Sequence, residues 1–302
     1  MDMRCVSYDE LGQYIADNEA FLLRDESRNN LILGRLGRMV RQPTDAPLLV
    51  TVKHAGSVLG QAIRTGPEDL LLLSKLPKGG VDCLIEHLFE RGIRLSGVVG
   101  PRDTCGPFAD GWSARNGLVT EIRMEQGVYE LRSVIMPDGA GGRLVLAAAA
   151  DRPAARPLLE GFVRECFPEE ADPVGKVDKR LEKFIHEERL FLWEDAEGRV
   201  VAAAANSRET RNTACLSWVY TPPEHRGRGH ASRVVAGASQ VLLDRGATAC
   251  NLFTDLTNAT SNALYQRLGY QKIDEALDIA FTSTGRTRER TTVPFDDVGP
   301  AR

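Results

Sequence analysis

The sequence predicts an α/β (α+β) protein of two similar domains, each a mixed central sheet flanked by helices, of which the C-terminal one is complete. Three observations support this prediction. The chain has 302 residues, more than one compact core of roughly 100–200 residues usually takes. Strand-like and helix-like segments alternate along residues 143–282, and part of that order recurs upstream. Between the two halves, residues 136–142 carry a proline and three glycines, which interrupt regular structure.

We therefore predict an N-terminal domain over residues 1–138, a C-terminal domain over residues 143–282 and a flexible tail over residues 283–302. The tail follows the last expected strand. Its sequence is polar, punctuated by proline and mixed in charge, which is typical of a segment that buries no core.

The hydrophobic periodicity of the C-terminal half predicts the order strand, helix, helix, three strands, helix, strand, helix, strand. Apolar residues at helical spacing mark the helices, and short apolar runs mark the strands. Turn residues 195–198 join two strands as a hairpin, and Pro222-Pro223 ends the next strand because proline cannot continue a hydrogen-bonded ladder. The expected bounds are 143–148, 154–167, 174–188, 190–194, 200–204, 213–220, a helix ending at Arg245, 249–255, a helix within 258–270, and 276–281.

The N-terminal half repeats part of this order, which we interpret as a diverged duplication. One predicted helix ends in Arg91-Gly92, much as the later one ends in Arg245-Gly246. The loop before that first helix, residues 76–80, lacks the motif described next, so the first copy is predicted to be a wall or lid without chemistry. The expected elements are a hairpin of 47–52 and 58–63, a strand at 70–73, and helices at 81–91 and around 109–113.

Bulk composition disfavours several classes of protein. With 42% hydrophobic and 26% charged residues, the chain resembles a soluble globular protein, and its net charge of −4 argues against nucleic-acid binding through an overall positive field. The six cysteines form no C-x-x-C pair and the histidines are scattered, so we expect buried, reduced thiols and no metal site. Without an apolar run of about 18 residues or a charged leader before an apolar segment, we expect a cytoplasmic protein and no membrane partner.

The most informative motif is the glycine loop, Arg226–Ala231 (RGRGHA), which follows a strand and opens an amphipathic helix. The first N–H groups of a helix have no intrahelical partners, and glycine lets an anion approach the backbone closely. The arrangement therefore suits a diphosphate. A dinucleotide fingerprint would require a third glycine where Ser232 stands, and a Walker loop would require Gly-Lys-Ser/Thr, so neither pattern is present.

The glycine loop fits Arg-x-x-Gly-x-Ala and resembles the acyl-CoA pyrophosphate loop of the GNAT superfamily of N-acetyltransferases. Downstream, Asn258, Tyr265 and Gly269-Tyr270 resemble the closing segment of that family. Asn258 and Tyr265 stand about two helical turns apart and so share one face of their helix. The resemblance covers residues 143–282, and the N-terminal half in outline, like the tandem arrangement in which a single GNAT domain binds acyl-CoA productively.

The resemblance implies direct attack of a neutral amine on the thioester of acetyl-CoA. A backbone N–H near Val219 would stabilise the oxyanion, and the glycine loop would bind the diphosphate, with Arg226 or Arg228 adding contacts at the rim. Asn258 would hold the pantetheine arm or the loop that shapes it, and Tyr265 is the candidate general acid. The cofactor-binding residues so predicted are Trp218, Val219, Tyr220, Arg226, Gly227, Arg228, Gly229, His230, Ala231 and Asn258.

No general base is assigned, because the strand before the glycine loop carries no carboxylate. Glu224, His225 and Asp255 are the nearby titratable groups, and each could act through a water. Glu224 and His225 are more typical of solvated loop positions, and Asp255 equally suits a cap for the next helix. Tyr265 also suits packing on an amphipathic helix, but its register with Asn258 favours the functional interpretation.

The leading interpretation is an acetyl-CoA-dependent N-acetyltransferase acting on a primary amine, with a small molecule expected as acceptor. The acceptor would lie in a groove between the domains or beside the first two helices of the second domain. The alternative is a non-catalytic acyl-CoA-binding sensor or scaffold, which the missing strand carboxylate favours and Tyr265 disfavours. The sequence leaves open the acceptor and the oligomeric state, a homodimer included.

Overall fold

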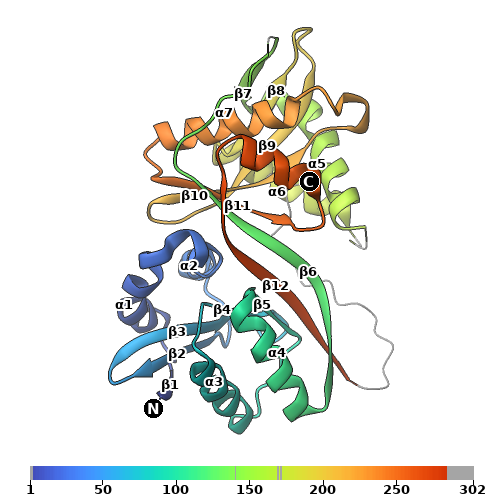
Figure 1. Cartoon of the computed structure of the whole chain (residues 1–302). Helices are drawn as coiled ribbons and strands as arrows, with labels where there is room; N and C mark the ends of the chain where they lie inside the picture. The colour runs from blue at the N-terminus through green and yellow to red at the C-terminus, as the bar shows by residue number, and fades with distance from the viewer. Residues whose placement is uncertain (1–2, 140, 169, 171, 284–302) are drawn as a thin grey trace. The chain divides into compact units, whose positions relative to one another are not determined.

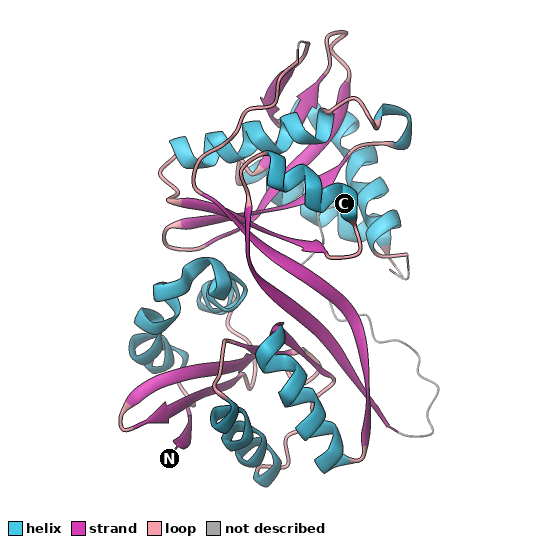
Figure 2. Ribbon diagram, viewed as in Figure 1, coloured by secondary structure: helices cyan, strands magenta, loops and turns pink. Residues whose placement is uncertain are grey.

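The structure is a computed structural model that describes residues 3–139, 141–168, 170 and 172–283 (Figures 1 and 2). Contacts divide the chain into two compact units. Among the described residues, the first unit comprises those up to Gln126 together with those from Asp274, and the second comprises Gly127–Ile273. The divisions fall inside two strands, β6 (Leu118–Leu131) and β12 (Gln271–Ser283), and not in a linker.

The first unit has the order strand, two helices, three strands, helix, strand, helix, strand. Its sheet runs β1-β2-β3-β4-β5-β12, in which β4 and β5 are parallel and the other described pairs are antiparallel. Leu84, Phe108 and Trp112 anchor the core on the helices that cover this sheet. The elements are β1 (Met3–Ser7), α1 (Leu11–Leu22), a 3-10 turn (Leu23–Asp25), α2 (Glu26–Arg41), β2 (Leu48–His54), β3 (Ser57–Arg64), β4 (Leu71–Leu73), α3 (Lys78–Glu90), β5 (Gly97–Pro101), α4 (Arg102–Asn116) and the start of β6.

The second unit repeats this order, which confirms the predicted duplication. Its sheet runs β6-β11-β10-β9-β8-β7, in which β10 and β11 are parallel and the described pairs from β7 to β10 are antiparallel. The elements are β7 (Arg143–Leu146), a 3-10 turn (Ala149–Asp151), α5 (Arg152–Cys166), α6 (Pro173–His186), β8 (Leu190–Glu194), β9 (Val200–Glu209), β10 (Thr213–Tyr220), a 3-10 turn (Pro223–His225), α7 (His230–Asp244), β11 (Ala249–Asp255), α8 (Ala259–Arg267) and the start of β12.

The sheet of the second unit is covered on both faces. Along β9, Ala202 and Ala204 belong to a core shared with α7 and α8, whereas Ala203 and Ala205 belong to a core shared with α5 and α6. Successive side chains of a strand point to opposite faces, so a continuous run of small apolar residues suits a strand buried on both. This two-sided packing holds β10 between the two helical layers, with its C-terminal end leading into the glycine loop.

The last strands of the two repeats are exchanged. β12 ends the second repeat, yet it pairs antiparallel with β5, and its Leu277 and Ile279 lie in the core of the first unit. Conversely, β6 ends the first repeat and contributes Tyr129 and Leu131 to the core of the second unit. Each unit is therefore completed by a strand that belongs, in sequence, to the other repeat.

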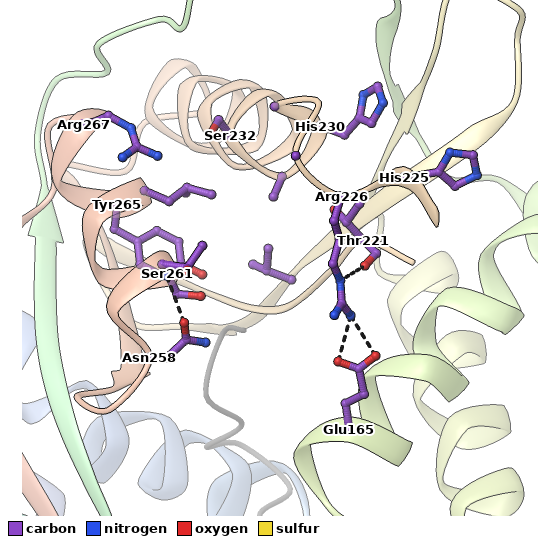
Figure 3. Close-up of a pocket in the computed structure, with 16 residues that line it drawn as sticks. Glu165, Thr221, His225, Arg226, His230, Ser232, Asn258, Ser261, Tyr265 and Arg267 are labelled. Carbon is purple, nitrogen blue, oxygen red and sulfur yellow. Dashed lines mark hydrogen bonds and ion pairs between the residues drawn. The ribbon is translucent and has the colours of Figure 1, made fainter. Parts of the chain in front are cut away.

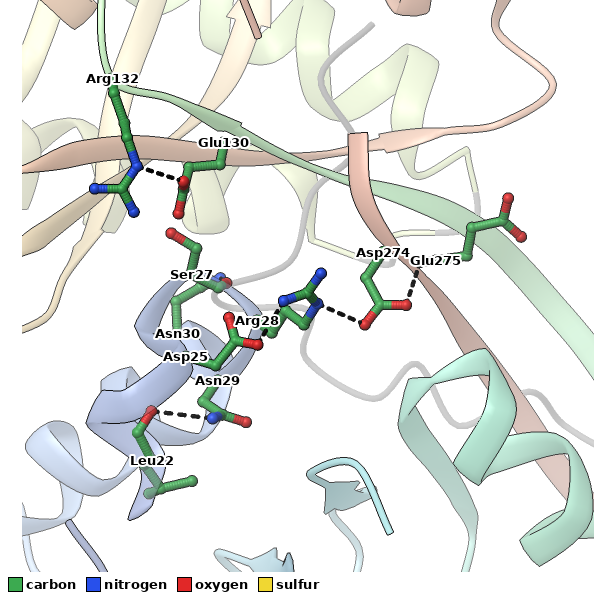
Figure 4. A network of polar contacts seen from close by, with 10 residues as sticks. All are labelled: Leu22, Asp25, Ser27, Arg28, Asn29, Asn30, Glu130, Arg132, Asp274 and Glu275. Carbon is green, nitrogen blue, oxygen red and sulfur yellow. Dashed lines mark hydrogen bonds and ion pairs between the residues drawn. The ribbon is translucent and has the colours of Figure 1, made fainter. Parts of the chain in front are cut away.

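Ion pairs accompany the exchanged strand in the first unit. Arg28 of α2 donates to Asp274 at 3.0 Å (Figure 4). Arg102 of α4 bridges Glu125 of β6 and Glu275 of β12, at 2.7 Å in each case. These side chains are partly exposed, and such pairs contribute less than about 1 kcal/mol each, so the buried apolar residues of β12 stabilise its position more than the ion pairs do.

The observed division differs from the predicted domain bounds. We placed the boundary at residues 136–142, whereas the contacts divide the chain at Gln126 and again at Ile273. A stretch rich in glycine marks where regular structure stops, but an exchanged strand crosses a boundary without any change in composition. Ser283, the first residue of the tail predicted over residues 283–302, belongs to β12, and residues 284–302 lie outside the described residues.

The predicted elements of the C-terminal half are present, several with longer bounds. The helix predicted at 154–167 begins at Arg152, and the strand predicted at 200–204 continues to Glu209. The structure also contains β1, α1 and α2, which we did not predict. The six cysteines are free thiols, and within the described ranges no cluster of three or more acidic, cysteine or histidine side chains could hold a metal ion. In that same part of the chain, no helix has the length and apolarity needed to cross a membrane.

In the first unit, the segment that corresponds to the glycine loop is packed closed. Leu76 is buried, and its Cδ2 lies where a Cβ on Gly60 would approach to 2.4 Å. The Leu76 N–H donates a hydrogen bond to the Thr104 hydroxyl at 3.0 Å. The side chain and backbone of Leu76 are thus both engaged within their own unit.

Candidate active site

The candidate site lies where β10 and β11 part. The described ladder pairs Thr213–Cys215 with Ala249–Asn251, although β10 continues to Tyr220 and β11 to Asp255. The ladder between β10 and β9 is irregular as well, from Ser217 to Tyr220. The backbone at the end of β10 is therefore open toward β11, and its polar groups can serve a ligand in place of a neighbouring strand.

Trp218 produces the irregularity in β10. Its φ of +52° is rare for a bulky residue and costs energy that the surrounding packing must offset. That packing comes from Phe162 of α5 and Phe184 of α6, whose ring centroids lie 4.8 and 5.8 Å from the indole. The Trp218 side chain is therefore buried against α5 and α6, and the next residue, Val219, lines a cavity.

That cavity, of about 640 Å³, is lined by the end of β10, the glycine loop and α8, with one residue from α5 (Figure 3). Of the predicted site residues, it brings together Val219, Arg226, Gly227, Gly229, His230, Ala231, Asn258 and Tyr265. Trp218, Tyr220 and Arg228 are not among its lining residues, so the first two could contribute only through backbone groups. The lining residues that we did not predict as binding or catalytic are Glu165, Thr221, His225, Ser232, Thr260, Ser261, Leu264 and Arg267.

The glycine loop offers a row of backbone donors to the cavity. Gly227 and Gly229 have φ of +75° and +77°, a conformation that favours glycine, and Gly229 is the N-terminal cap of α7. Among the described residues, no backbone hydrogen bond occupies the N–H groups from Gly227 to Ser232. The N–H of Arg226, by contrast, donates to the Pro223 carbonyl at 3.2 Å. The donor row therefore starts one residue later than predicted, and it includes Ser232.

The Arg226 side chain is turned away from the row of donors. Its guanidinium forms two hydrogen bonds with the Glu165 carboxylate, at 2.7 and 2.8 Å, and its Nε donates to the Thr221 carbonyl at 2.9 Å (Figure 3). The Tyr220 hydroxyl donates to the same carboxylate at 2.9 Å. Burial and this hydrogen bond raise the pKa of Tyr220 to about 12. The Arg226 guanidinium thus contacts α5 in this structure, and the rim contact of Arg226 or Arg228 with a diphosphate stays a prediction.

The two residues of the predicted closing motif lie at α8, Asn258 as its N-terminal cap and Tyr265 within the helix. Asn258 caps α8 by accepting a hydrogen bond from the Ser261 N–H at 3.1 Å, and it also lines the cavity. Asp255 accepts from the Thr257 N–H at 2.8 Å and so stabilises the preceding turn; it does not cap the helix. The Asn258 oxygen thus stabilises the N-terminus of α8, and its role toward the pantetheine arm stays a prediction.

Tyr265 lies in the last turns of α8, with its ring packed between Tyr129 and Tyr270 at centroid distances of 6.5 and 5.9 Å. It is 1% exposed and lines the cavity. Burial raises the pKa of its phenol well above the ordinary value, which keeps the group protonated at neutral pH. A protonated phenol in the cavity can donate a proton or a hydrogen bond.

Two histidines flank the glycine loop, His225 at the end of the preceding 3-10 turn and His230 at the first residue of α7. The rings of His225 and His230 are 6.4 Å apart and nearly perpendicular, and Figure 3 draws both on the side of the loop opposite Tyr265. Burial, with the neighbouring Arg233, lowers the pKa of His230, so this ring is neutral at pH 7. Glu224 does not line the cavity. Of the three titratable residues considered as bases, His225 is the one that does.

A polar signal in the sequence could have identified part of the lining that we missed. Ser232, Thr260 and Ser261 occupy first turns of α7 and α8, where unpaired N–H groups and hydroxyls gather. Glu165 carries no such signal, because it lies 61 residues before Arg226 on a helix whose sequence shows only ordinary amphipathicity. Its place in the site follows from tertiary packing.

Comparison with known proteins relates this chain to acetyltransferases. A family model described as FR47-like protein matches residues 196–279. The chain is similar to an acetyltransferase of Sodalis glossinidius, with 26% identity over 106 residues that span 35% of this chain and 72% of the relative. Its fold is similar to that of a GCN5-related N-acetyltransferase from Sphaerobacter thermophilus, with 15% identity, a TM-score of 0.57, and coverage of 92% of this chain and 95% of that one.

A second solved structure shares the duplicated architecture. It is a tandem GNAT protein from the clavulanic acid biosynthesis pathway, with 12% identity, a TM-score of 0.52, and coverage of 95% of this chain and all of that one (100%). At these identities the likeness to solved structures shows the fold alone. Taken with the matched family model over residues 196–279 and the relatives named acetyltransferases, it supports an acyltransferase of the GNAT type.

Proposed function

We propose that this protein transfers the acetyl group of acetyl-CoA to a primary amine of a small-molecule acceptor by direct attack. The observation that carries the proposal is that the unpaired N–H groups of the glycine loop and the protonated phenol of Tyr265 line one cavity. A helix N-terminus with free donors suits a diphosphate. The residues present therefore fit the phosphate end of CoA at one side of the cavity and thioester chemistry at the other.

The protein's main roles in this reaction are to position the two substrates and to stabilise the developing charge. The amine nitrogen attacks the thioester carbonyl, the C–S bond breaks and the CoA thiolate leaves, so one proton is lost from the amine and one is gained by the sulfur. Backbone N–H groups at the open end of β10 are suited to the developing oxyanion. Tyr265 is suited to protonate the thiolate, and the amine proton passes to solvent, since no lining carboxylate other than Glu165 is present among the residues described around the cavity.

Charge favours an anionic ligand in this cavity. The lining side chains with full charges are Glu165, Arg226 and Arg267. Arg226 and Glu165 neutralise each other, and no ion pair or hydrogen bond of the Arg267 guanidinium occurs within the described part of the chain. The net positive charge that remains suits the phosphates of CoA.

The test is isothermal titration with acetyl-CoA and with CoA, followed by a thiol-release assay against a panel of amines. Gly229→Asp places a Cβ and a negative charge in the glycine loop at φ +77°, and it should abolish CoA binding. Gly198→Asp is the matched control, because Gly198 has the same φ of +77° in the turn between β8 and β9, where an added Cβ would meet no heavy atom within 4 Å. It should bind CoA like the wild type.

The outcomes separate the two candidate functions. Binding that is lost in Gly229→Asp, together with thiol release for some amine, supports the transferase. Binding without thiol release across the whole panel favours the acyl-CoA-binding sensor. Absence of binding in the wild-type protein contradicts both.

A further inference from the structure

The Arg226 guanidinium forms hydrogen bonds at both of its ends in the ligand-free protein. One end meets the Glu165 carboxylate on α5, and the other meets the Thr221 carbonyl in the segment just before the glycine loop. Nη2 donates to both oxygens of the Glu165 carboxylate while Nε donates to the Thr221 carbonyl, so these three hydrogen bonds fix the orientation of the planar guanidinium as well as its distance from α5. The first residue of the glycine loop is thereby tied to a helix that is remote in sequence.

Tyr220 belongs to the same cluster and gives it a rigid base. Its hydroxyl donates to Glu165 at 2.9 Å, and its ring lies under the Arg226 guanidinium, 5.6 Å from the ring centroid to the guanidinium carbon. The ring fits against α5 because residue 161 is glycine, since a Cβ there would lie 2.5 Å from the ring carbons. Gly161 and Glu165 are one helical turn apart and share a face, so α5 presents a gap for the ring and a carboxylate for its hydroxyl.

We propose that Glu165 is a positioning residue for this site: it holds Tyr220 and Arg226 against α5, and so fixes the glycine loop in its binding geometry before the cofactor enters. This proposal rests on the proposed function. It assigns to Arg226 a role in shaping the loop, and it leaves the diphosphate to the backbone N–H groups that follow. The open end of β10 and the start of the loop then move with α5 as one body.

The change in CoA affinity caused by Glu165→Gln has opposite signs under the two possible roles of Glu165, so its measurement can distinguish them. If Arg226 is a phosphate ligand, Glu165 competes with the phosphates for it, and Glu165→Gln frees the guanidinium and tightens CoA binding. Loss of a negative charge near the phosphates acts in the same direction, because it removes a Coulomb repulsion. If Glu165 positions the loop, the same substitution weakens CoA binding. Work at about 0.5 M salt shortens the Debye length to a few ångström and suppresses the Coulomb contribution.

The experiment is a double-mutant cycle with Glu165→Gln, Arg226→Gln and the double variant, read by isothermal titration with CoA. We expect each single variant to raise the Kd about tenfold and the double variant to raise it no further, because both singles break the same contact. In steady-state assays the KM for acetyl-CoA should rise with the Kd, while kcat changes by less than about threefold. Arg226→Lys should recover only part of the affinity, since a lysine lacks the planar guanidinium that reaches Glu165 with Nη2 and the Thr221 carbonyl with Nε.

The matched control is Glu160→Gln. Glu160 is also on α5 and is paired with Arg156 at 3.0 Å, with a side-chain exposure of 29% against 33% for Glu165. It lies outside the cavity, so its substitution should leave the Kd for CoA unchanged. A control that weakens binding as much as Glu165→Gln would mean that the loss of any α5 ion pair is sufficient, and would overturn the specific role of Glu165.

Thermal unfolding of the ligand-free variants gives a readout that does not depend on CoA. The three variants should share a single fall in Tm of about 2 °C, again without additivity. Tighter binding by Glu165→Gln, additive effects on the Kd, or no coupling in the ligand-free protein would each overturn the positioning role. If the wild type binds no CoA, the proposed function fails and this inference with it; if it binds but the cycle shows no coupling, only the positioning role fails.

Discussion

The phenol of Tyr129 donates a hydrogen bond to the Asn262 side chain at 2.8 Å. Tyr129 lies on β6, the last strand of the first repeat, whereas Asn262 lies on α8 of the second repeat. Asn262 in turn donates to the Asp255 and Asn258 carbonyls, both at 2.8 Å. A residue from the first half of the chain thus supports the turn that places Asn258 and the helix that carries Tyr265.

The first prediction follows from this contact. A fragment of residues 143–282, the domain predicted from the sequence, should not fold, because it lacks Tyr129 and Leu131, each 1% exposed in the second core. Loss of two large buried side chains costs about 3–5 kcal/mol each, which is comparable to the whole stability of a domain. Circular dichroism and thermal melting of the fragment should show no cooperative transition.

The control for that fragment is residues 127–273, which keep the β6 residues and omit the part of β12 that belongs to the first unit. This fragment should melt cooperatively. Equal folding of both fragments would mean that the exchanged strand contributes little to the second core, and would contradict the prediction.

The second prediction concerns Tyr265. Tyr265→Phe should lower kcat. The decrease should not exceed the usual contribution of a general acid, which is about a hundred- to ten-thousand-fold. The loss stays partial because a thiol titrates near pH 8.5, which makes the thiolate a tolerable leaving group at neutral pH without protonation. The Kd for acetyl-CoA should stay within about twofold. Thiol-release kinetics and isothermal titration measure the two quantities separately.

Tyr270→Phe is the control for that substitution. Tyr270 is buried next to Tyr265, and its hydroxyl exchanges a hydrogen bond with Ser239 at 2.9 Å, outside the cavity lining. Its removal should lower the free energy of unfolding by about 1 kcal/mol with little change in kcat. A Tyr265→Phe variant that behaves in the same way would assign Tyr265 to packing alone.

The parts of the fold and of the site that could be predicted from the sequence are those encoded by residues close together in the chain. The glycine loop and the spacing of Asn258 and Tyr265 were readable because a turn that needs positive φ and a helix face are encoded by consecutive residues. The structure brings these residues to one cavity. The strand β11 was also predicted with the bounds it has, since turn residues flank a short apolar run.

The parts that were not readable depend on distant contacts. Nothing in the sequence near Arg226 indicates that Glu165, 61 residues away, takes its guanidinium. The exchange of β6 and β12 was equally hidden, because a strand has the same hydrophobic pattern whichever sheet it completes. The buried face of β12 is decided by which partner strand it meets, and that is a property of the tertiary structure.

The third prediction tests the packing of the Tyr220 ring against Gly161 of α5. Gly161→Ala should lower the free energy of unfolding by about 1–3 kcal/mol, because the new methyl group overlaps the Tyr220 ring and hydroxyl at 2.5–2.6 Å. Gly12→Ala in α1 is the control, since its Cβ would meet no heavy atom within 4 Å. That change should be neutral or stabilising by up to about 1 kcal/mol. Urea denaturation measures the free energy of unfolding of both variants. Equal changes in the two variants would contradict the prediction.

The fourth prediction concerns pH and Asp278 of β12. Its carboxylate is fully buried beside Arg123, 3.1 Å away, and burial raises its pKa from 3.8 to about 6 despite that partner. Because the folded state then binds a proton more tightly than the unfolded state, this group stabilises the fold below about pH 4, and that contribution is lost as the pH rises to about 6. Asp278 therefore makes the free energy of unfolding fall as pH rises through this range.

Asp278→Asn removes the titration while keeping the shape of the side chain. The difference in unfolding free energy between the variant and the wild type should shift in favour of the variant by about 2 kcal/mol between pH 4.5 and pH 7, as two pKa values about two units apart require. Urea denaturation at the two pH values measures this difference, and groups common to both proteins cancel from it. A difference that does not change with pH would mean that the Arg123 contact fully offsets the burial of the Asp278 carboxylate, so that its pKa in the folded protein is close to that in the unfolded chain.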